Sequence, residues 1–321
     1  MKITNLFENK IFLAPLAGFT DAGFRSLAKK YGCGLTVTEM TSAKSLEMNN
    51  PRAKELLVTT KNEKPVAVQL FGHEPKVFEK VAQSRYLEKF DIIDINMGCP
   101  MKKIIGNGDG SALLDNPALA EKLIKAVKKS GKFVTVKMRV GIKDSNGAED
   151  FAKICEDAGA DMITVHGRTQ SQMYSGKADR NAIARVVQAV RIPVIANGDI
   201  TDKQSYKDIL NVTNAYGVAI GRGCLGKPYI FAELSGKDYE FDILTDVTEH
   251  INVLSEYLPE RVVVNEMKKH VCYYVKGMKN NNLFCVKLCN AKKINDIISE
   301  LSLFLEGCKK LTEKSDNDII K

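Results

Sequence analysis

The sequence predicts a (β/α)8 TIM barrel followed by a small all-α helical domain. Between residues 11 and 235, a short apolar run rich in β-forming residues recurs eight times, and amphipathic stretches separate the runs. Eight β/α units in a stretch of this length are typical of a closed parallel barrel. After about residue 240 the strand pattern stops and only helical patterns remain.

Each predicted strand is a short apolar run, and most of them end near Gly, Asn or Asp. The eight runs are 11–18, 35–40, 66–72, 92–100, 133–141, 162–168, 193–199 and 217–223. Amphipathic patterns predict intervening helices at 75–86, 117–130, 148–158, 181–190 and 203–210. Further helices are predicted at 244–258, 261–276 and 290–305. We therefore place the barrel in residues 1–240 and the helical domain in residues 241–321.

Composition limits the class of protein. The chain has 321 residues, of which 44% are hydrophobic and 27% charged, and this excludes a disordered chain, a collagen-like repeat and a disulfide miniprotein. No apolar run approaches the roughly 20 residues of a membrane helix. The eight cysteines form no CxxC pair, which favours reduced thiols in the cytoplasm. Cys285 and Cys289 could form half of a zinc site, but no second ligand pair follows, so we expect packing and no metal.

The net charge of +8 is concentrated in one segment. Residues 261–293 contain eight Lys or Arg and one acid, Glu266, which gives +7 in thirty-three residues. Such a concentration is typical of a polyanion-binding surface, although a solvated helix face can have the same pattern. Tyr273 and Tyr274 lie among the lysines and could stack on bases or pack in a core. RNA is therefore a candidate partner.

Reactive groups in a barrel of this kind lie at the carboxyl ends of its strands. The predicted ends carry an unusual polar set: Gln69, Asn96 with Cys99, Lys137 with Arg139, His166 with Arg168, Asn197 with Asp199, and Arg222. Lys137 and Arg139 share one face of their strand, so two cations enter the barrel mouth together. A bound anion would balance them. Salt bridges to Asp94 or Asp199 are the alternative.

Strands seven and eight end in glycine-containing segments, 197–199 and 221–223. Glycine lets the backbone approach phosphate oxygens, and Arg222 can pair with them, so we expect a phosphate site here. Residues 221–226 also match G-x-G-x-x-G. That match follows the last strand and does not open a βαβ unit, so it does not indicate a dinucleotide fold.

Cys99 is the strongest candidate for catalysis. It lies between Gly98 and Pro100, just after the fourth strand, at the start of a glycine-rich segment that we expect to be a mobile loop. A cysteine in this place can be an acid, a nucleophile or a thiolate, and a packing role is the alternative. Lys102 and Lys103 are expected to favour the thiolate.

Six ordered motifs resemble the tRNA-dihydrouridine synthases, and most of all the bacterial B-type branch. They are PLAGFTD (15–21), INMGCP (95–100), VTVKMRVG (134–141), VHGRT (165–169), ANGDI (196–200) and IGRG (220–223). The basic segment, with Lys268, Lys269 and His270, fits the same pattern. Three positions depart from it: Leu16 replaces the usual Met, Val140 the usual Thr, and Asp109 a small residue, which could affect loop closure.

The resemblance implies an FMN enzyme that uses NADPH to reduce the C5=C6 bond of uridine in the tRNA D loop. The residues implied for FMN are Pro15, Leu16, Ala17, Gln69, Lys137, His166, Asn197, Gly198, Asp199, Gly221 and Arg222. Those assigned to the RNA substrate are Asn96, Arg139, Arg168, Lys268, Lys269 and Lys276. Hydride addition at C6 leaves an enolate, and an acid must protonate C5. A thiol with a pKa of about 8.5 suits that step, so we assign it to Cys99.

Three alternatives remain open at this point. The substrate could be uridine in ribosomal RNA, or a small enone or pyrimidine reduced by an FMN barrel without RNA. The chain could also be a non-catalytic RNA-binding protein whose barrel has lost its enzymatic activity. We expect a monomer with no membrane contact.

Overall fold

The computed structural model describes residues 1–319, with side chains described up to residue 309. Its nine strands belong to one parallel sheet in the order β1-β9-β8-β7-β6-β5-β4-β2, and β3 pairs with β4 beside β2. A bridge between Phe12 and Leu35 connects β1 to β2 and closes the ring. The strands are β1 (Ile11–Leu13), β2 (Thr36–Val37), β3 (Thr41–Ser42), β4 (Val66–Phe71), β5 (Ile92–Met97), β6 (Phe133–Arg139), β7 (Met162–His166), β8 (Val194–Asn197) and β9 (Gly217–Ile220).

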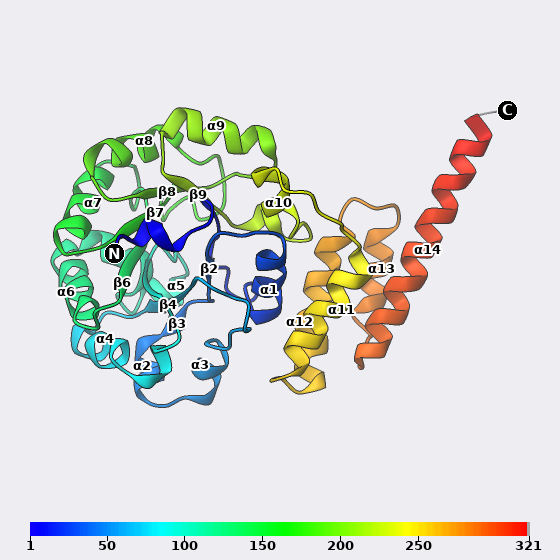
Figure 1. Ribbon diagram of the computed structural model, residues 1–321, viewed down its shortest axis with the longest axis horizontal. Helices are drawn as coiled ribbons and strands as arrows, with labels where there is room; N and C mark the ends of the chain where they lie inside the picture. Colours follow the sequence, from blue (N-terminus) through cyan, green and yellow to red (C-terminus); the bar gives the residue numbers. More distant parts are fainter. Residues whose placement is uncertain (320–321) are drawn as a thin grey trace.

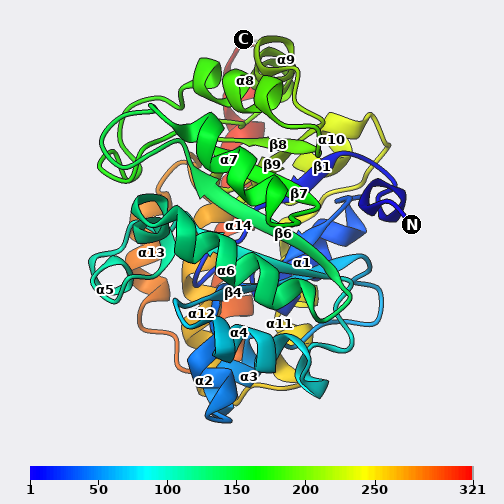
Figure 2. The same cartoon turned by 90° about the vertical axis from the view of Figure 1, so that its left-hand side faces the viewer.

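Helices surround the ring, as Figures 1 and 2 show. They are α1 (Ala22–Lys30), α2 (Ala43–Glu47), α3 (Pro51–Glu55), α4 (Pro75–Ala82), α6 (Pro117–Lys128), α7 (Ala148–Asp157), α8 (Arg180–Ala189), α9 (Lys203–Thr213) and α10 (Ile230–Ser235). Their apolar faces and the outward faces of the strands form one continuous core. The predicted barrel is confirmed, and its five predicted helices correspond to α4, α6, α7, α8 and α9.

The barrel interior changes from apolar to polar along the strands. On β5, Ile92 belongs to the apolar cluster inside the barrel, while Asp94 and Asn96, on the same face, are buried polar residues nearer the carboxyl end. Phe133 on β6 packs against the same apolar cluster, and Lys137 is nearer the carboxyl end of that strand. The apolar end therefore stabilises the barrel, and the polar end is left for a site.

Two predicted segments differ from the structure. The strand predicted at 35–40 is interrupted, because Glu39 leaves the sheet and its carboxylate accepts a hydrogen bond from the Gly18 N–H. The segment expected to be a mobile loop is largely helical: α5 (Lys102–Ile105) and a 3-10 helix, η3 (Gly110–Asp115). Asp109, the unusual residue of that segment, is buried and contacts His73 Nδ1 at 2.7 Å.

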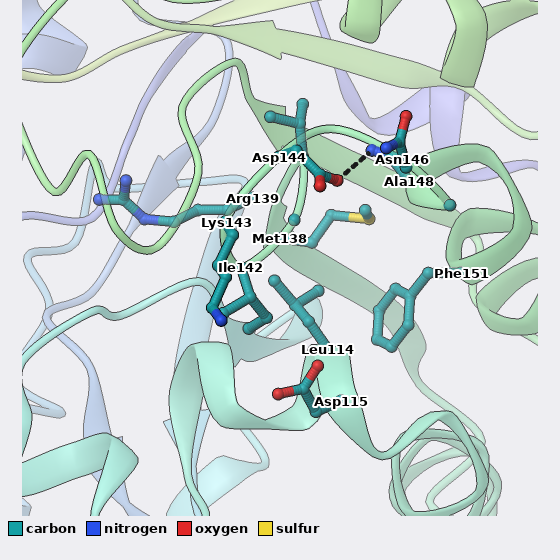
Figure 3. Close-up of a pocket in the computed structure, with 13 residues that line it drawn as sticks. Leu114, Asp115, Met138, Arg139, Ile142, Lys143, Asp144, Asn146, Ala148 and Phe151 are labelled. Atoms are coloured by element: carbon teal, nitrogen blue, oxygen red, sulfur yellow. Dashed lines mark hydrogen bonds between the residues drawn. The ribbon is translucent and has the colours of Figure 1, made fainter.

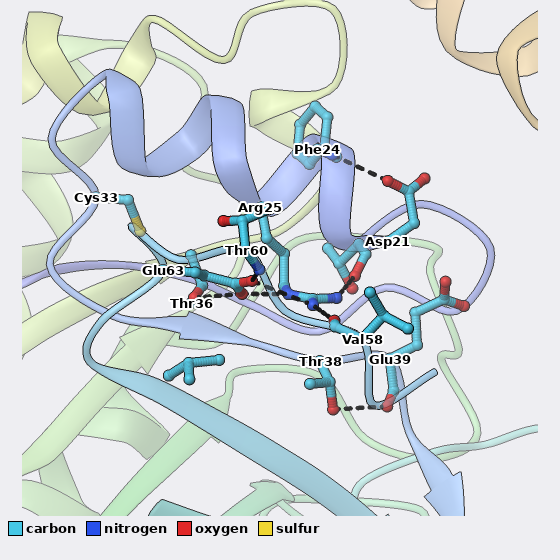
Figure 4. Close-up of polar contacts among 12 residues, drawn as sticks. Asp21, Phe24, Arg25, Cys33, Thr36, Thr38, Glu39, Val58, Thr60 and Glu63 are labelled. Carbon is cyan, nitrogen blue, oxygen red and sulfur yellow. Dashed lines mark hydrogen bonds and ion pairs between the residues drawn. The ribbon is translucent and has the colours of Figure 1, made fainter. Parts of the chain in front are cut away.

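A buried ion pair anchors the segment between β1 and α1 (Figure 4). Arg25 pairs with Glu63 and donates to the carbonyl oxygens of Thr20 (2.6 Å) and Val58 (2.5 Å). Glu63 also accepts from the Thr36 hydroxyl at 3.0 Å. With its partners satisfied, the pair fixes Thr20, whose hydroxyl accepts from the N–H of Leu16 (3.0 Å). The pair thereby positions one wall of the barrel mouth.

Four helices follow the barrel and have a hydrophobic core of their own: α11 (Ile243–Ser255), α12 (Glu260–Tyr274), α13 (Asn281–Leu288) and α14 (Ile294–Ile319). Three of them match predicted helices, and α13 is additional. In Figure 1 this bundle lies beside α1. Within residues 1–319, no helix is both long enough and apolar enough to span a bilayer.

The junction between bundle and barrel contains three buried or largely buried polar residues. Asp21, at the start of α1, accepts from Phe24 N and lies 2.8 Å from His250 Nε2 of α11 and 3.2 Å from His270 Nε2 of α12. Burial opposes ionisation of Asp21, but His250 and His270 hold its pKa well below the usual value. We call these three residues the junction cluster. In the described part of the chain, it is the one group with the spacing of metal ligands, and Cys285 and Cys289 gain no further ligand there.

Candidate active site

A cavity of about 830 Å³ opens at the carboxyl ends of the strands. It is lined by fifteen predicted site residues from the barrel and one from the turn after α12: Pro15, Leu16, Ala17, Gln69, Asn96, Cys99, Lys137, Arg139, His166, Arg168, Asn197, Gly198, Asp199, Gly221, Arg222 and Lys276. Lys268 and Lys269 are the predicted site residues outside this lining. We call this space the main cavity. The fold therefore brings together residues that are up to 261 positions apart in the sequence.

A smaller cavity of about 390 Å³ lies against β6 and the loop that leads to α7 (Figure 3). Of the predicted site residues, only Arg139 reaches its lining. In Figure 3 the Arg139 guanidinium extends away from Leu114 and Phe151. Apart from Arg139, this second cavity therefore contains none of the clustered polar groups that distinguish the main cavity.

Four cations of the barrel line the main cavity beside Lys276, and the structure divides these four into two kinds. Arg139 donates to the carbonyl oxygens of Gly98 (2.7 Å), Thr169 (2.8 Å) and Met173 (2.8 Å). Arg168 forms an ion pair with Asp199 at 2.7 Å. These two arginines hold the surrounding loops in place. The expected substrate contacts of Arg139 and Arg168 thus compete with contacts inside the protein.

Lys137 and Arg222 remain available to a ligand. No described residue accepts a hydrogen bond from the Lys137 ammonium or forms an ion pair with it. Burial, and then the charge of Arg139, lowers the pKa of Lys137 to about 8. The exposed Arg222 guanidinium lies 5.2 Å from the centre of the Tyr174 ring. The salt bridges from Lys137 to Asp94 or Asp199, considered from the sequence, do not form, and a bound anion fits the two cations better.

His166 is neutral in this environment. Burial, followed by the charges of Lys137, Arg139, Arg168 and Arg222, lowers its pKa to about 2. An imidazole held without charge can accept a hydrogen bond from a neutral hydroxyl group. It adds no further positive charge to the cavity.

The ends of β8 and β9 allow a ligand to approach the backbone closely. Asn197 donates Nδ2 to Ala219 O (2.7 Å), which ties the two strand ends together. Gly198 has φ +129°, and a Cβ there would lie 2.7 Å from the Cβ of Ala178. Glycine is therefore required at this position. The adjacent Asp199 also has positive φ, 54°, and is held by Ala178 N at 2.8 Å.

Cys99 is half-buried at the edge of the main cavity. Its N–H donates to Asn96 Oδ1 (2.9 Å), and its carbonyl accepts from the Ser111 hydroxyl (2.8 Å). Burial raises the pKa of the thiol, and the cations that oppose this effect are Arg139 and Lys137. Lys102 and Lys103, expected to favour the thiolate, are exposed and are not among these cations. The site therefore favours a protonated sulfur.

Tyr273 of α12 and Lys276, in the turn after that helix, complete the wall of the main cavity. Tyr273 contacts Phe19 edge to face, with ring centroids 5.4 Å apart. Lys269 is paired with Glu266 and lies 5.5 Å from the centre of the Phe19 ring. Lys268 points elsewhere and donates to the carbonyl of Cys289 (2.9 Å). The bundle thus adds one aromatic ring, Tyr273, and one cation, Lys276, to the lining of the main cavity, while Lys268 and Lys269 lie outside it.

Sequence reasoning missed several lining residues, including Phe19, Met40 and Tyr174. Tyr174 lies between two cations, with Arg139 5.8 Å and Arg222 5.2 Å from its ring centre. It belongs to the segment between β7 and α8, and no strand-end pattern singles it out. The only sequence signal that could have identified Tyr174 was its aromatic side chain in the segment that follows the carboxyl end of β7.

Comparisons with known proteins agree with this geometry. The family model described as dihydrouridine synthase (Dus) matches residues 12–303. A probable tRNA-dihydrouridine synthase of Rickettsia conorii is 38% identical over 297 residues, covering 88% of this chain and 90% of that protein. A tRNA-dihydrouridine synthase B of Pasteurella multocida is 37% identical over 288 residues, covering 86% and 87%.

Among solved structures, a complex of 2-naphthoyl-CoA reductase with 2-naphthoyl-CoA superposes with a TM-score of 0.59. It is 11% identical, and the match covers 74% of this chain and 52% of that one, so this chain matches about half the length of that structure. The likeness supports the barrel fold alone.

Proposed function

The chain belongs to the dihydrouridine synthase family, and from this premise we propose that it reduces the C5=C6 bond of uridine in the D loop of tRNA. The observation that carries the proposal is the placement of one half-buried thiol, Cys99, at the edge of a cavity that holds the unpaired cation Lys137. The protein would act in the cytoplasm, where its RNA substrate is found.

FMN fits the residues of the main cavity. The unpaired, half-buried Lys137 calls for an anionic or electron-rich partner, and Arg222 beside the glycine-containing ends of β8 and β9 suits a phosphate. We propose that Pro15, Leu16, Ala17, Gln69 and Lys137 hold the ring, and that His166, Asn197, Gly198, Asp199, Gly221 and Arg222 hold the ribityl chain and phosphate. When bound and reduced by NADPH, FMN supplies the hydride that is added at C6.

Cys99 supplies the proton in this mechanism. The enolate formed after hydride addition takes a proton at C5, and the sulfur keeps the electron pair of the S–H bond as a thiolate. Burial keeps the thiol protonated at neutral pH. Asn96 is assigned to the uracil, and Lys137 balances negative charge at the pyrimidine end of the cofactor.

Replacement of the thiol tests this assignment. Cys99→Ala should lower the rate of dihydrouridine formation by about 100-fold or more, because general acid catalysis contributes factors of that order. Dihydrouridine is measured by mass spectrometry of tRNA from cells lacking the gene and complemented with the variant. Cys289→Ala, which alters an exposed thiol of the bundle, is the matched control and should retain wild-type activity. Wild-type activity in Cys99→Ala would refute the assignment.

The helical bundle is proposed to bind tRNA, with the division from the catalytic barrel between residues 240 and 241. A uridine within a folded D loop must leave its stack to reach the main cavity. Lys276 is exposed, lines that cavity and lies 6.0 Å from the centre of the Tyr273 ring, so it can contact phosphate beside an extruded base.

Neutralisation of the bundle lysines measures this contact. Replacing Lys268, Lys269 and Lys276 by Ala should weaken tRNA binding and reduce the dependence of log Kd on log salt, by about one unit of slope per lost phosphate contact. Singly, Lys276→Ala should have a larger effect than Lys268→Ala, because Lys268 is already bonded to Cys289. Unchanged affinity with an unchanged slope in the triple variant would exclude this part of the bundle as the tRNA contact.

Two measurements separate the proposal from its alternatives. A flavin absorbance band in the purified protein would exclude the alternative that the chain is a non-catalytic RNA-binding protein. Mass-spectrometric mapping of dihydrouridine in cells without the gene would then distinguish tRNA from ribosomal RNA, and both from a small-molecule substrate.

A further inference from the structure

Polar side chains form a continuous line of hydrogen bonds from the interior of the barrel to the lining of the main cavity. Asp94 on β5 accepts from the Thr135 hydroxyl at Oδ1 and from Gln69 Nε2 at Oδ2 (2.7 Å). Asn96, two residues along β5, donates Nδ2 to Gln69 Oε1 (2.8 Å). Asn96 Oδ1 then accepts from the N–H of Cys99 (2.9 Å). The line therefore runs from inside the barrel to the loop that carries the thiol.

The sheet register places these residues side by side. Gln69 on β4 and Thr135 on β6 are the direct neighbours of Asp94 on either side. Asp94 and Asn96 share the inward face of β5 because side chains alternate along a strand. Gln69, Asp94 and Asn96 are all buried, so their polar atoms must find partners within the protein.

The two ends of the line fix the orientation of both amides. Burial raises the pKa of Asp94, and the hydrogen bonds from Gln69 and Thr135 oppose that rise. Because Asp94 accepts at both oxygens, the Gln69 nitrogen faces Asp94 and the Gln69 oxygen faces Asn96. A backbone N–H has only a donor, so Asn96 must present its oxygen to Cys99 and its nitrogen to Gln69. Both ends demand the same arrangement, and every member of the line is satisfied.

We propose that Asp94 is a positioning residue that holds the Cys99 loop, residues 98–101, through Gln69 and Asn96. Asp94 does not line the main cavity, so its hydrogen-bonded connection to the thiol loop runs through this line. Its charge also acts on Lys137, and the variant Asp94→Asn, which removes the charge and keeps an acceptor, separates the two effects. The inference deepens the proposed function, on which it rests, because it identifies what places the proton donor. Without an acceptor at position 94, Gln69 is free to turn, and Asn96 no longer has one enforced orientation toward the loop.

Reversing the line tests its polarity. Asn96→Asp alone replaces the donor that faces Gln69 Oε1 with a carboxylate oxygen, so two acceptors meet. If the Gln69 amide turned over, its Oε1 would instead meet the carboxylate of Asp94. We expect the melting temperature to fall by about 5 °C, as for a buried unsatisfied polar pair. In the double variant Asp94→Asn/Asn96→Asp, the line can run in the opposite direction with every bond made, and we expect recovery to within about 2 °C of wild type.

A second double variant separates hydrogen-bond polarity from charge. Asp94→Leu/Asn96→Asp also leaves one carboxylate in the line, but it provides no donor for Gln69 Oε1. The melting temperature of this variant should stay low. If Asp94→Leu restores stability as fully as Asp94→Asn does, relief of charge repulsion explains the rescue and the positioning role is overturned.

The reactivity of the thiol reports on the loop itself. The full-length protein is alkylated with iodoacetamide, and each cysteine peptide is followed by mass spectrometry. Asp94→Leu should raise the rate at Cys99 on the order of tenfold relative to exposed Cys289, while buried Cys33 stays protected and shows that the barrel is folded. Asp94→Asn, which keeps an acceptor, should stay within about twofold of wild type.

An unchanged Cys99 rate in Asp94→Leu, with Cys33 protected, would overturn the proposal. If Cys33 becomes reactive, the barrel has opened and the reversal experiment decides instead. Neither measurement uses dihydrouridine formation, so failure of the positioning role is distinguishable from failure of the proposed function. Activity lost in Cys99→Ala would still support the thiol as proton donor even if Asp94 proved irrelevant to the loop.

Discussion

Gly23 lies near the start of α1, where a residue with a side chain would normally be preferred. In an exposed helix, Gly→Ala stabilises by about 1 kcal/mol because glycine loses more backbone entropy on folding. The surroundings of Gly23 oppose this gain. A Cβ there would overlap the His250 ring at Cδ2 and would lie 2.9 Å from the backbone oxygen of His250. We therefore expect Gly23→Ala to destabilise the protein.

The magnitude follows from the backbone contact. Ordinary contact begins at 3.4 Å, so even the His250 oxygen is too close by about 0.5 Å, and a backbone atom cannot rotate away. Helix α11 must shift from α1, and this also strains the 2.8 Å contact between His250 and Asp21. Overpacking costs about 1–3 kcal/mol and the weakened hydrogen bond about 1 kcal/mol, so the net loss after the helix gain is about 1–3 kcal/mol.

Urea unfolding followed by circular dichroism measures this change. Gly307→Ala is the matched control, because Gly307 lies within α14 and its added Cβ would have no atom within 4 Å. The control should gain up to about 1 kcal/mol, and Gly23→Ala should lose stability. If both variants are stabilised equally, the close contact of α1 with α11 does not limit position 23 and the reasoning is wrong.

Two further predictions concern buried charges. Glu63→Gln should lower the free energy of unfolding by about 3 kcal/mol, because it leaves Arg25 charged and unpaired in the barrel. The control Glu79→Gln breaks an exposed pair with Lys129 and should cost under about 1 kcal/mol. Equal losses in urea unfolding would contradict this prediction. Burial lowers the pKa of His270 in the folded protein, so the unfolded chain binds more protons below its own pKa of about 6.5. The contribution of His270 to stability should therefore be complete above that pH and should decline as the pH falls, by up to about 1.4 kcal/mol per pH unit. In urea titrations from pH 7.5 to 5, His270→Gln should lose stability less steeply than the wild type. Parallel curves would refute a lowered pKa of His270.

The barrel could be predicted from the sequence because its signal is local. Eight apolar runs at regular spacing specify eight strands, and strand ends specify which residues face the mouth. This reasoning placed Lys137, His166 and Asn197 at one site, where all three line the main cavity. Cys99 was likewise predictable, since the segment after a barrel strand is a usual place for reactive groups.

The partners of those residues could not be predicted. Arg139 and Lys137 look equivalent in the sequence, two positions apart on one strand. In the structure Arg139 is bound to three carbonyl oxygens, while Lys137 has no hydrogen-bond acceptor among the described residues. Lys268 and Lys276 belong to the same basic segment, yet only Lys276 lines the main cavity. The helical content of the segment after Cys99 was also missed, because glycine-rich sequences resemble irregular loops.

By itself the sequence determined the order of the strands, the polar character of their carboxyl ends and the family resemblance. These depend on residue type and on spacings of a few positions. The tertiary structure alone decided which cations are free, how Asp94 reaches Cys99 through Gln69, and that Asp21 meets His250 and His270 more than 220 positions away. Hydrogen bonds act over about 3 Å, so the pairing of distant segments is fixed only when packing brings their side chains within that distance.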